Sequence, residues 1–492
     1  MAEKRNGEKE EYAAQEVGRI YSHFRGIAKV YGLAGAAIGE RLTFEKSGLS
    51  GLVVGFDRDF LDVLIFGDFT KISGDETAVR TGEQFTVPVG EAYIGRVVNA
   101  LGEPIDGRGS LIPSARSEVE REAPGVVERE PVREPLLTGT KLIDALLPIG
   151  RGQRELILGD RKTGKSSIAI DAVINQKSAR RRLYCVYCLV GQKESVNAET
   201  IGALEKEGAL LYTTIVVASA SSSMNEQYLA PYVATAIAEF FRDRGEDALI
   251  VYDDLTKHAW IWRQISLLLK RPPGREAYPG DIFYLHSRLL ERAAKLNADK
   301  GSGSLTALPI VETQEGDIAA FIPTNLISIT DGQIYLDAGL FQAGFLPAIN
   351  IGLSVSRIGS QAQPKALAEV TRGLRVLLAQ HAELKRLSEI EATFSEESRR
   401  RLKRGDVVLE ILKQDKRAPI SLARQIATFY LATGGYFDDL PIEKVSVVEE
   451  IIHGYLGGTY KFAEEEISKK GLTDKAKKAL QEIAKKSTEE AA

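Results

Sequence analysis

The sequence is poor in cysteine, and this scarcity narrows what the protein can be. Its 492 residues include two cysteines, Cys185 and Cys188, in the run LYCVYCLVG. A C-x-x-C pair occurs in redox and metal sites, but a structural zinc needs about four ligands. The flanking residues predict a buried strand, in which positions three apart point to opposite faces. We therefore expect two packed free thiols in a reducing compartment, and neither a disulfide nor a metal site.

The chain also lacks a dominant charge and a long apolar run. It has 64 Lys and Arg against 68 Asp and Glu, a formal net charge of −4. Without a basic excess we expect no nucleic-acid partner, because phosphate contacts dominate that kind of binding. No apolar run approaches the ~20 residues that a membrane span needs. The charged start MAEKRNGEKEEY resembles neither a signal peptide nor a transit peptide. We expect contact with a membrane only through partner subunits.

Length and pattern predict a multi-domain α/β chain, because 492 residues exceed one compact core and suggest about three domains. Residues 1–15 are polar, and we expect them to be disordered. Over 16–89, short apolar runs broken by Gly and Asp predict an N-terminal β-barrel. The segment 103–135 combines Pro, Gly and many charges, which indicates a long connection over the surface.

Residues 90–362 and 363–492 differ in pattern. From about Arg154, apolar runs alternate with helical stretches such as SSIAIDAVINQK, which predicts a parallel sheet covered by helices. Beyond Pro364 the strand pattern stops, and the stretches 367–387, 395–413 and 420–433 predict an α-helical third domain.

The last 30 or so residues are rich in Lys and Glu, with apolar positions at Leu480 and Ile483. This pattern predicts an exposed amphipathic helix with a loose end.

One local motif points directly to chemistry. It fits G-x-x-x-x-G-K-[ST] and consists of Gly159, Asp160, Arg161, Lys162, Thr163, Gly164, Lys165 and Ser166. Such a loop wraps backbone N–H groups around phosphate oxygens, with Lys165 reaching the terminal phosphates and the Ser166 hydroxyl reaching Mg²⁺. The helix that begins at about Lys165 directs its positive end at the anion. A chance glycine-rich turn would lack the apolar strand Glu155–Leu158 before it and the amphipathic helix after it.

A second candidate group is Asp253, which ends the apolar run 248–252. An acid at the end of a buried strand commonly holds the Mg²⁺ that the loop serine also contacts. Strand alternation turns Asp254 elsewhere, so Asp253 is the better candidate. The alternative is an aspartate that caps the following helix.

Four long stretches, 148–177, 270–295, 322–334 and 347–360, closely resemble the alpha subunits of F-type ATP synthases. The similarity extends from about residue 16 to the C-terminal helices. It implies an N-terminal β-barrel, a central P-loop (RecA-like) parallel-sheet nucleotide domain and a C-terminal α-helical bundle. It also implies ATP and Mg²⁺ as cofactors.

The resemblance further implies partners and a location. Such subunits alternate with beta subunits in a hexameric ring around the gamma shaft, and the delta subunit and peripheral stalk attach to the ring. The complex makes ATP from an ion gradient. For this chain we therefore expect a peripheral location at the cytoplasmic face of a bacterial cell membrane. Only about 15 polar residues precede the predicted barrel, where the family has an additional helix for the stalk, so stalk attachment is expected to differ.

Two residues decide between an alpha-like and a beta-like role. The beta subunit has a glutamate where this chain has Gln192, and an amide cannot take up a proton as a general base does. We therefore expect a site that binds ATP without hydrolysing it. By the same resemblance, Arg357 is an arginine finger that reaches the partner's site, worth roughly 10³–10⁵-fold in related enzymes. Ser354 shapes its loop. The alternative is an arginine paired with a local carboxylate.

The resemblance fails at the base end of the site. Gln414 is kept there and is expected to contact ATP, but the family's second glutamine is Lys416 here. The arginine expected before Pro347 is Leu346, and a glutamine of the phosphate loop is Lys162. Two other functions therefore stay open: a binding-only scaffold with an altered pocket, and a stand-alone hexameric motor ATPase of the related secretion and RNA-translocase group. The motor would need a catalytic glutamate, and Gln192 disfavours it.

Overall fold

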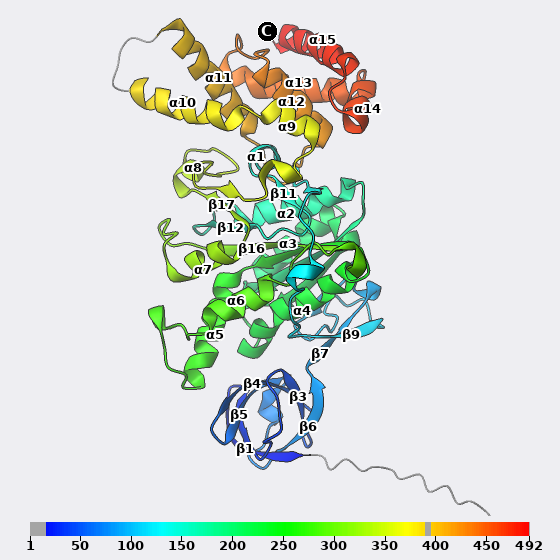
Figure 1. The fold of residues 1–492 in the computed structure, drawn as a ribbon, viewed down its shortest axis with the longest axis vertical. Coiled ribbons are helices and arrows are strands. Elements are labelled where there is room, and N and C mark those ends of the chain that lie inside the picture. The colour runs from blue at the N-terminus through cyan, green and yellow to red at the C-terminus, as the bar shows by residue number, and fades with distance from the viewer. Residues whose placement is uncertain (1–15, 389–394, 492) are drawn as a thin grey trace, which may run out of the picture.

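The computed structural model of the protein describes residues 16–388 and 395–491, so the disorder predicted for 1–15 lies outside the described residues. Three bodies are stacked along the long axis: a β-barrel, an α/β body in the middle and a group of helices at the opposite end (Figure 1). The predicted fold class, with its barrel, parallel-sheet domain and helical domain, is confirmed.

The N-terminal barrel is closed by six strands in the order β1-β2-β5-β4-β3-β6. The strands are β1 (Val17–Phe24), β2 (Ile27–Tyr31), β3 (Glu40–Phe44), β4 (Ser50–Asp57), β5 (Phe60–Phe66) and β6 (Thr77–Gln84). Its interior is apolar and fully buried at Val30, Leu42 and Phe44. The next strand, β7 (Thr86–Val89), pairs with β9 (Ala115–Glu118) instead, so the barrel wall ends with β6.

The middle body is built on an eight-stranded sheet of order β18-β17-β12-β16-β15-β13-β14-β8, in which only β18 runs antiparallel. Its strands are β8 (Val97–Asn99), β12 (Leu156–Gly159), β13 (Leu183–Val190), β14 (Thr213–Ala218), β15 (Asp247–Asp253), β16 (Ser304–Glu312), β17 (Gly332–Leu336) and β18 (Val355–Ser356). A small separate pair is formed by β10 (Pro135–Leu136) and β11 (Ile149–Gly150).

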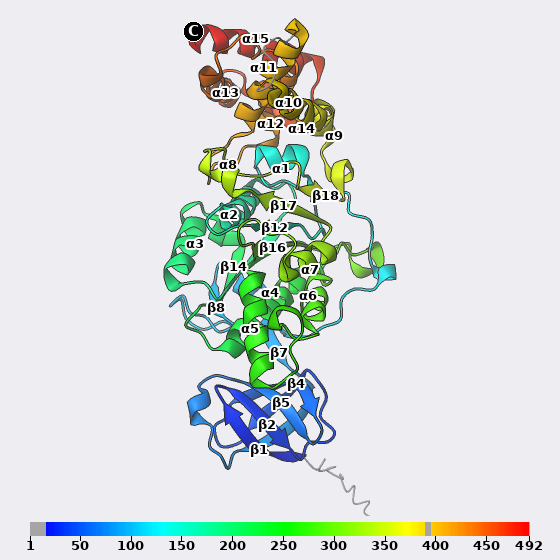
Figure 2. The ribbon, with the colours of Figure 1, turned by 90° about the vertical axis from the view of Figure 1, so that its left-hand side faces the viewer.

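Helices cover both faces of this sheet, with α2 and α3 on one side and α6 and α7 on the other (Figure 2). The helices of the middle body are α1 (Lys141–Leu146), α2 (Lys165–Asn175), α3 (Glu194–Lys206), α4 (Met224–Arg242), α5 (Leu255–Leu268), α6 (Ile282–Leu290), α7 (Phe321–Ile329) and α8 (Ala338–Gln342). Because the strands are parallel, the residues that follow β12, β13 and β15 gather at one edge of the sheet.

The two thiols behave as the sequence predicts. Both are buried and unpaired on β13. Cys185 packs in the apolar cluster that includes α2, whereas Cys188 packs in the cluster that includes α4 and α5. Burial raises the pKa of both thiols above their usual range. They are therefore inert packing groups, since a reactive cysteine needs an accessible thiolate.

The C-terminal domain is helical throughout its described part. It contains α9 (Lys365–Thr371), α10 (Leu374–Ser388), α11 (Glu396–Leu412), α12 (Leu422–Thr433), α13 (Ile442–Gly457), α14 (Lys461–Lys470) and α15 (Asp474–Ala491). The predicted stretch 367–387 is split between α9 and α10 beside Gly373, a residue that weakens helices. No helix among residues 16–388 and 395–491 has the length and apolar character to cross a bilayer.

The prediction of an exposed, loose final helix is wrong. Helix α15 runs to Ala491 and buries Leu480 and Ile483 completely. Its apolar stripe packs against α13, and this burial anchors the helix in the bundle because each buried aliphatic side chain contributes about 1.5–3 kcal/mol.

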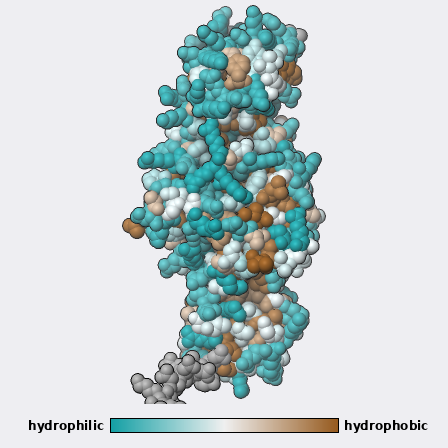
Figure 3. Space-filling view, turned by 90° about the vertical axis from the view of Figure 1, so that its right-hand side faces the viewer, coloured by the Kyte–Doolittle hydropathy of each residue, from teal (hydrophilic) through white to brown (hydrophobic). Residues whose placement is uncertain are grey.

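The surface is mostly hydrophilic, with apolar groups gathered over the middle of the face in Figure 3. The long connection predicted for 103–135 carries three of the most exposed apolar side chains. Val126 is 90% exposed, Val127 86% and Ile112 84%. Single exposed apolar side chains are common on protein surfaces, so these residues alone do not mark an interface.

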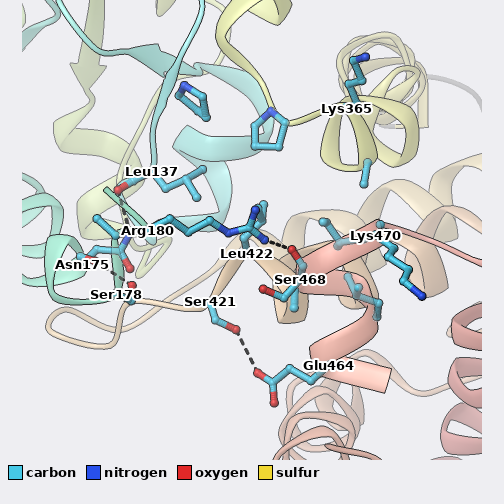
Figure 4. Close-up of a pocket in the computed structure, with 18 of the residues that line it drawn as sticks. Leu137, Asn175, Ser178, Arg180, Lys365, Ser421, Leu422, Glu464, Ser468 and Lys470 are labelled. Carbon is cyan, nitrogen blue, oxygen red and sulfur yellow. Dashed lines mark hydrogen bonds between the residues drawn. The ribbon is translucent and has the colours of Figure 1, made fainter. Parts of the chain in front are cut away.

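A cavity of about 560 Å³ separates the middle body from the C-terminal helices. In it the Arg180 guanidinium reaches across to the carbonyl of Ser468, and Ser421 donates to Glu464 (Figure 4). The end of α2 forms one wall through Asn175, whose amide donates to the Leu137 carbonyl. No residue of the motif 159–166 lines this cavity, so it is a joint between the two domains and not the phosphate site.

A buried ion pair fastens the same two domains. The Lys141 ammonium on α1 donates to both carboxylate oxygens of Glu449 on α13, at 2.7 and 2.8 Å. The Lys141 side chain is 2% exposed and that of Glu449 10%. Burial raises the pKa of Glu449, and Lys141 opposes that rise.

We expect Glu449→Ala to lower the free energy of unfolding by about 3–5 kcal/mol, because it leaves the Lys141 charge buried without its partner. Denaturant unfolding of the full chain measures this. The matched control is Glu450→Ala, which removes an exposed carboxylate at the next position and should change stability by less than about 0.5 kcal/mol. Equal effects of the two substitutions would contradict the role of the pair.

Candidate functional site

The loop 159–166 has the shape that its sequence predicts. It follows β12, and α2 begins at Lys165 with Gly164 as its N-cap in the left-handed region. Gly159 and Gly164 have φ of +155° and +102°. A Cβ at Gly159 would lie 2.5 Å from the carbonyl oxygen of Leu336, so only glycine fits. The N–H groups at the start of α2 are thereby free to meet an anion.

Lys165 is held inside the loop. Its side chain donates to the carbonyl oxygens of Gly159 and Asp160, at 2.9 and 2.6 Å. Burial lowers its pKa, and the acidic groups around it oppose that change. The ammonium is therefore preorganised beside the place where a terminal phosphate would lie, because its rotamer is fixed by the loop itself.

Other members of the motif support the loop. The Asp160 carboxylate accepts from the Thr313 hydroxyl and the Gly316 backbone N–H, at 2.7 and 2.9 Å. The Thr163 hydroxyl donates to the Asp160 carbonyl. Arg161 and Lys162 are exposed, and Arg161 lies 3.7 Å from Glu312. Asp160 and Thr163 therefore shape the loop, whereas Arg161 and Lys162 reach the solvent side.

The two predicted metal ligands lie together. Asp253 ends β15, is 2% exposed, and accepts hydrogen bonds from the hydroxyls of Ser166 and Tyr187. Burial raises its pKa, which these hydroxyls and the nearby lysines oppose. A hydroxyl and a carboxylate are oxygen ligands of the kind Mg²⁺ prefers, with phosphates and water completing its shell. The residues present therefore fit a Mg²⁺ ion that would neutralise phosphate charge there.

Gln192 follows β13 and points at this pair. Its amide nitrogen donates to Asp253 at 2.8 Å and to Asp254 at 3.3 Å. Asp254 itself caps α5 through the Lys257 backbone N–H, so the capping alternative applies to Asp254 and not to Asp253. The prediction that alternation turns Asp254 away from the site is wrong, because its carboxylate also contacts Gln192 and acts on Lys165. The group beside the predicted metal is consequently an amide that is held in place by two carboxylates.

The sequence did not single out Lys257 and Glu312. Glu312 ends β16, and Lys257 pairs with Asp254 and lies 3.5 Å from Glu312. Glu312 raises the pKa of Lys165, whereas Lys257 lowers it. Their contacts join the ends of β15 and β16, and the order of those strands could not be read from the sequence.

Gln414 occupies the base end of the site but does not present its amide there. Its side-chain oxygen accepts from the Lys141 backbone N–H at 2.9 Å, and its nitrogen donates to the carbonyls of Gly139 and Ala418, each at 2.8 Å. The side chain thus fastens the C-terminal domain to the segment before α1. The Gln414 amide therefore has no free N–H to donate to a nucleotide, as the prediction requires.

A cavity of about 350 Å³ adjoins the phosphate loop. It is lined by Thr140, Lys162, Thr163, Gly164, Ser167, Ile168, Asp171, Leu336, Phe341, Leu346, Pro347, Gln414, Asp415 and Lys416. One side is apolar and the other carries charged groups. The cavity has the size and the position for the base and sugar of a nucleotide whose phosphates lie on the loop.

The carboxyl of Asp171 in this cavity gives the protein a pH-dependent stability. Burial raises its pKa from 3.8 to about 6, although the Arg417 backbone N–H donates to it. Between these values the folded protein keeps a proton that the unfolded chain has released. Stability therefore falls as pH rises through this window, by up to about 3 kcal/mol.

Asp171→Asn keeps the acceptor for Arg417 and removes the titration. We expect its free energy of unfolding, relative to the wild type, to increase from pH 4 to pH 6.5. Denaturant unfolding at several pH values measures this, with the exposed Asp415→Asn as control. If both variants followed the wild type in parallel, Asp171 would not be the responsible group.

The segment around Arg357 is held by hydrogen bonds along its backbone, while the Arg357 side chain is exposed. The Arg357 backbone N–H donates to the Asp331 carbonyl at 2.9 Å. The Ser354 hydroxyl donates to the Asn350 carbonyl and accepts from the Tyr335 N–H, and Ser356 donates to the Pro148 carbonyl. The loop is thus bonded on three sides, and Ser354 supports it as the sequence suggests.

The Arg357 side chain is exposed. Among the residues that the structure describes, it forms no ion pair, but its charge acts on the nearby buried carboxyl of Glu155, so the alternative of a local carboxylate partner stays open. Arg357 is also absent from the lining of the cavity beside the phosphate loop. The exposed Arg357 side chain therefore lies outside the cavity that adjoins this chain's own phosphate loop.

Beneath this loop lies a buried polar pair. Gln153 donates to Glu155 at 2.7 Å, and its nitrogen is 3.4 Å from the Ser356 hydroxyl. Both side chains are fully buried. Burial raises the pKa of Glu155 well above its usual range, with Arg357 opposing the rise. The loop that carries Arg357 therefore packs on a buried pair of hydrogen-bonded side chains.

Comparison with known proteins gives concordant matches. Residues 139–356 match the nucleotide-binding domain of the ATP synthase alpha/beta family, and residues 363–487 match the C-terminal domain of ATP synthase alpha/beta chains. An ATP synthase subunit alpha of Helicobacter pylori is 50% identical over 465 residues, which cover 94% of this chain and 92% of the relative. That of Aquifex aeolicus is 51% identical over 469 residues, covering 95% and 93%. That of Ehrlichia canis is 50% identical over 481 residues, covering 96% and 94%.

Proposed function

Since the chain belongs to the ATP synthase alpha/beta family, within which it groups with the alpha subunits, we propose that it is a non-catalytic alpha subunit. As a member of this family it is a nucleotide-binding subunit of an ATP-synthesising rotary enzyme. More specifically, we propose that the chain binds Mg-ATP without turning it over and supplies Arg357 to a partner's site. We also propose that it works in ion-gradient-driven ATP synthesis.

The observation that carries the non-catalytic role is the contact of Gln192 with Asp253 and Asp254. A hydrolytic site of this kind needs a group beside the metal that orients and deprotonates water. Here the amide N–H groups are turned toward the two carboxylates, and an amide cannot accept the proton. The phosphate loop and the Ser166–Asp253 pair support binding, while the step of water activation lacks its base.

The assisting role rests on the loop of Arg357. An exposed guanidinium on a hydrogen-bonded loop, outside the cavity beside its own chain's phosphate loop, suits a charge delivered to a phosphoryl group across an interface. The bonds of Ser354 and Ser356 to backbone groups reduce the freedom that the loop would lose on docking. The resulting role is stabilisation of transition-state charge in the partner's active site.

The proposed partners are a catalytic beta subunit, which alternates with this chain in a hexameric ring, the gamma shaft and the delta subunit with the peripheral stalk. Mg²⁺ is the proposed metal. The proposed location is peripheral, at the cytoplasmic face of a bacterial cell membrane, through the membrane subunits of the complex.

Purification of the tagged chain from its own cell tests this assembly. We expect beta subunit in a 1:1 ratio with this chain, together with substoichiometric gamma. A homo-hexamer that contains this chain alone would contradict the proposal and would instead support the stand-alone motor.

A further inference from the structure

The cavity beside the phosphate loop has two unlike sides. Leu336, Phe341, Leu346 and Pro347 form an apolar wall, which suits the flat face of a purine. Asp171, Asp415 and Lys416 lie among the polar lining groups. Base identity must be selected on this polar side, because a hydrophobic wall distinguishes purines only weakly.

Glutamine would be the expected reader of adenine, but Gln414 is not available for it. Both N–H groups of its amide donate to the backbone carbonyls of Gly139 and Ala418, and its oxygen accepts from Lys141 N–H. Adenine is read by an amide that donates to N7 and accepts from the N6 amino group at the same time. A side chain whose donors are already used cannot make that paired contact.

Lys416 is a positively charged group on this side of the cavity. The residue is exposed and lines the cavity. It forms no ion pair with any other residue of the described chain. A lysine offers donors and no acceptor, so the base edge that it prefers must present acceptors to it.

The two purines differ at this edge. Guanine presents O6 and N7, two adjacent acceptors, and lysine or arginine is the usual partner of that pair. Adenine presents the N6 amino group beside N7, so a lysine there meets a donor. Guanine also carries N–H groups at N1 and N2, which a carboxylate accepts, and both Asp171 and Asp415 line the cavity.

We propose that the nucleotide site of this chain favours guanine over adenine, with Lys416 as the residue that determines base specificity. This inference rests on the proposed nucleotide-binding function and changes only the identity of the nucleotide. Phosphate binding by Lys165 and the loop is the same for either purine. The ligand class is a Mg-bound purine nucleoside triphosphate with an oxygen at position 6.

Calorimetry of the isolated full chain with Mg-ATP, Mg-GTP and Mg-ITP tests this. We expect GTP to bind more tightly than ATP. Inosine keeps O6, N7 and the N1 proton and lacks only the 2-amino group, so ITP should bind like GTP if Lys416 reads the edge. An affinity for ATP that equals or exceeds those for GTP and ITP would overturn the inference.

Lys416→Gln tests the contribution of Lys416 to the preference for guanine. It replaces a donor by an amide that can read adenine, so we expect the ratio of GTP to ATP affinity to fall about tenfold. Lys413→Gln is the matched control, because Lys413 pairs with Glu410 and does not line the cavity. Equal ratios in both variants would overturn the role of Lys416. Failure of every nucleotide to bind the wild-type chain would instead overturn the nucleotide site itself.

Discussion

In the complex with the catalytic beta subunit, Arg357→Ala should lower ATP turnover by roughly 10³–10⁵-fold, the range that arginine fingers contribute in related enzymes. The physical reason is the loss of a positive charge from the partner's transition state. Arg357 makes no ion pair within the described chain, so its removal should leave the fold intact. Steady-state phosphate release by the reconstituted complex measures the effect.

The specific controls for this prediction keep the assembly constant. Arg357→Lys retains the charge without the planar fork, and we expect an intermediate loss. Arg400→Ala removes an exposed arginine from α11 and should leave turnover unchanged. The three complexes should have the same subunit ratio on gel filtration. Normal turnover by an assembled Arg357→Ala complex would exclude the finger.

Lys165→Ala should weaken binding of Mg-nucleotide to the isolated chain by about 100-fold or more. The ammonium is buried within the loop, and its hydrogen bonds to phosphate oxygens are charge-assisted, worth roughly 1.5–3 kcal/mol each. Calorimetry with Mg-ATP and Mg-GTP measures the loss, and far-UV circular dichroism verifies that the variant is folded.

Lys162→Ala is the matched control for this experiment. Lys162 lies in the same loop but is exposed, and a solvated charge contributes little. We expect its affinity to stay within about fivefold of the wild type, in keeping with a median below about 1 kcal/mol for exposed pairs. If Lys162→Ala weakened binding as much as Lys165→Ala does, the phosphate would lie nearer the outer rim of the loop.

Much of the site could be predicted because its residues lie in short, contiguous sequence patterns. The phosphate loop is a contiguous motif, and the run that ends at Asp253 identifies itself as a buried strand. Parallel strands bring such ends to one edge of a sheet, so Ser166 and Asp253 meet as expected. The opposite burial of Cys185 and Cys188 follows from the same alternation.

Other features could not be predicted, because they depend on contacts between distant parts of the chain. The Gln414 amide donates to the carbonyl of Gly139, 275 positions away, and the sequence around Gln414 does not indicate that partner. The burial of α15 depends on α13. Amphipathic patterning shows that a helix has an apolar face, but it does not show which surface covers that face.

We propose above that this chain assists catalysis in a partner's site and does not turn over nucleotide itself. Phosphate release by the purified chain, measured alone and again after addition of its beta subunit, distinguishes an assisting subunit from a catalytic one. We expect turnover by the chain alone to be below about 1% of that of the mixture, because a missing general base costs roughly 10²–10⁴-fold. Turnover by the isolated chain equal to that of the mixture would contradict it.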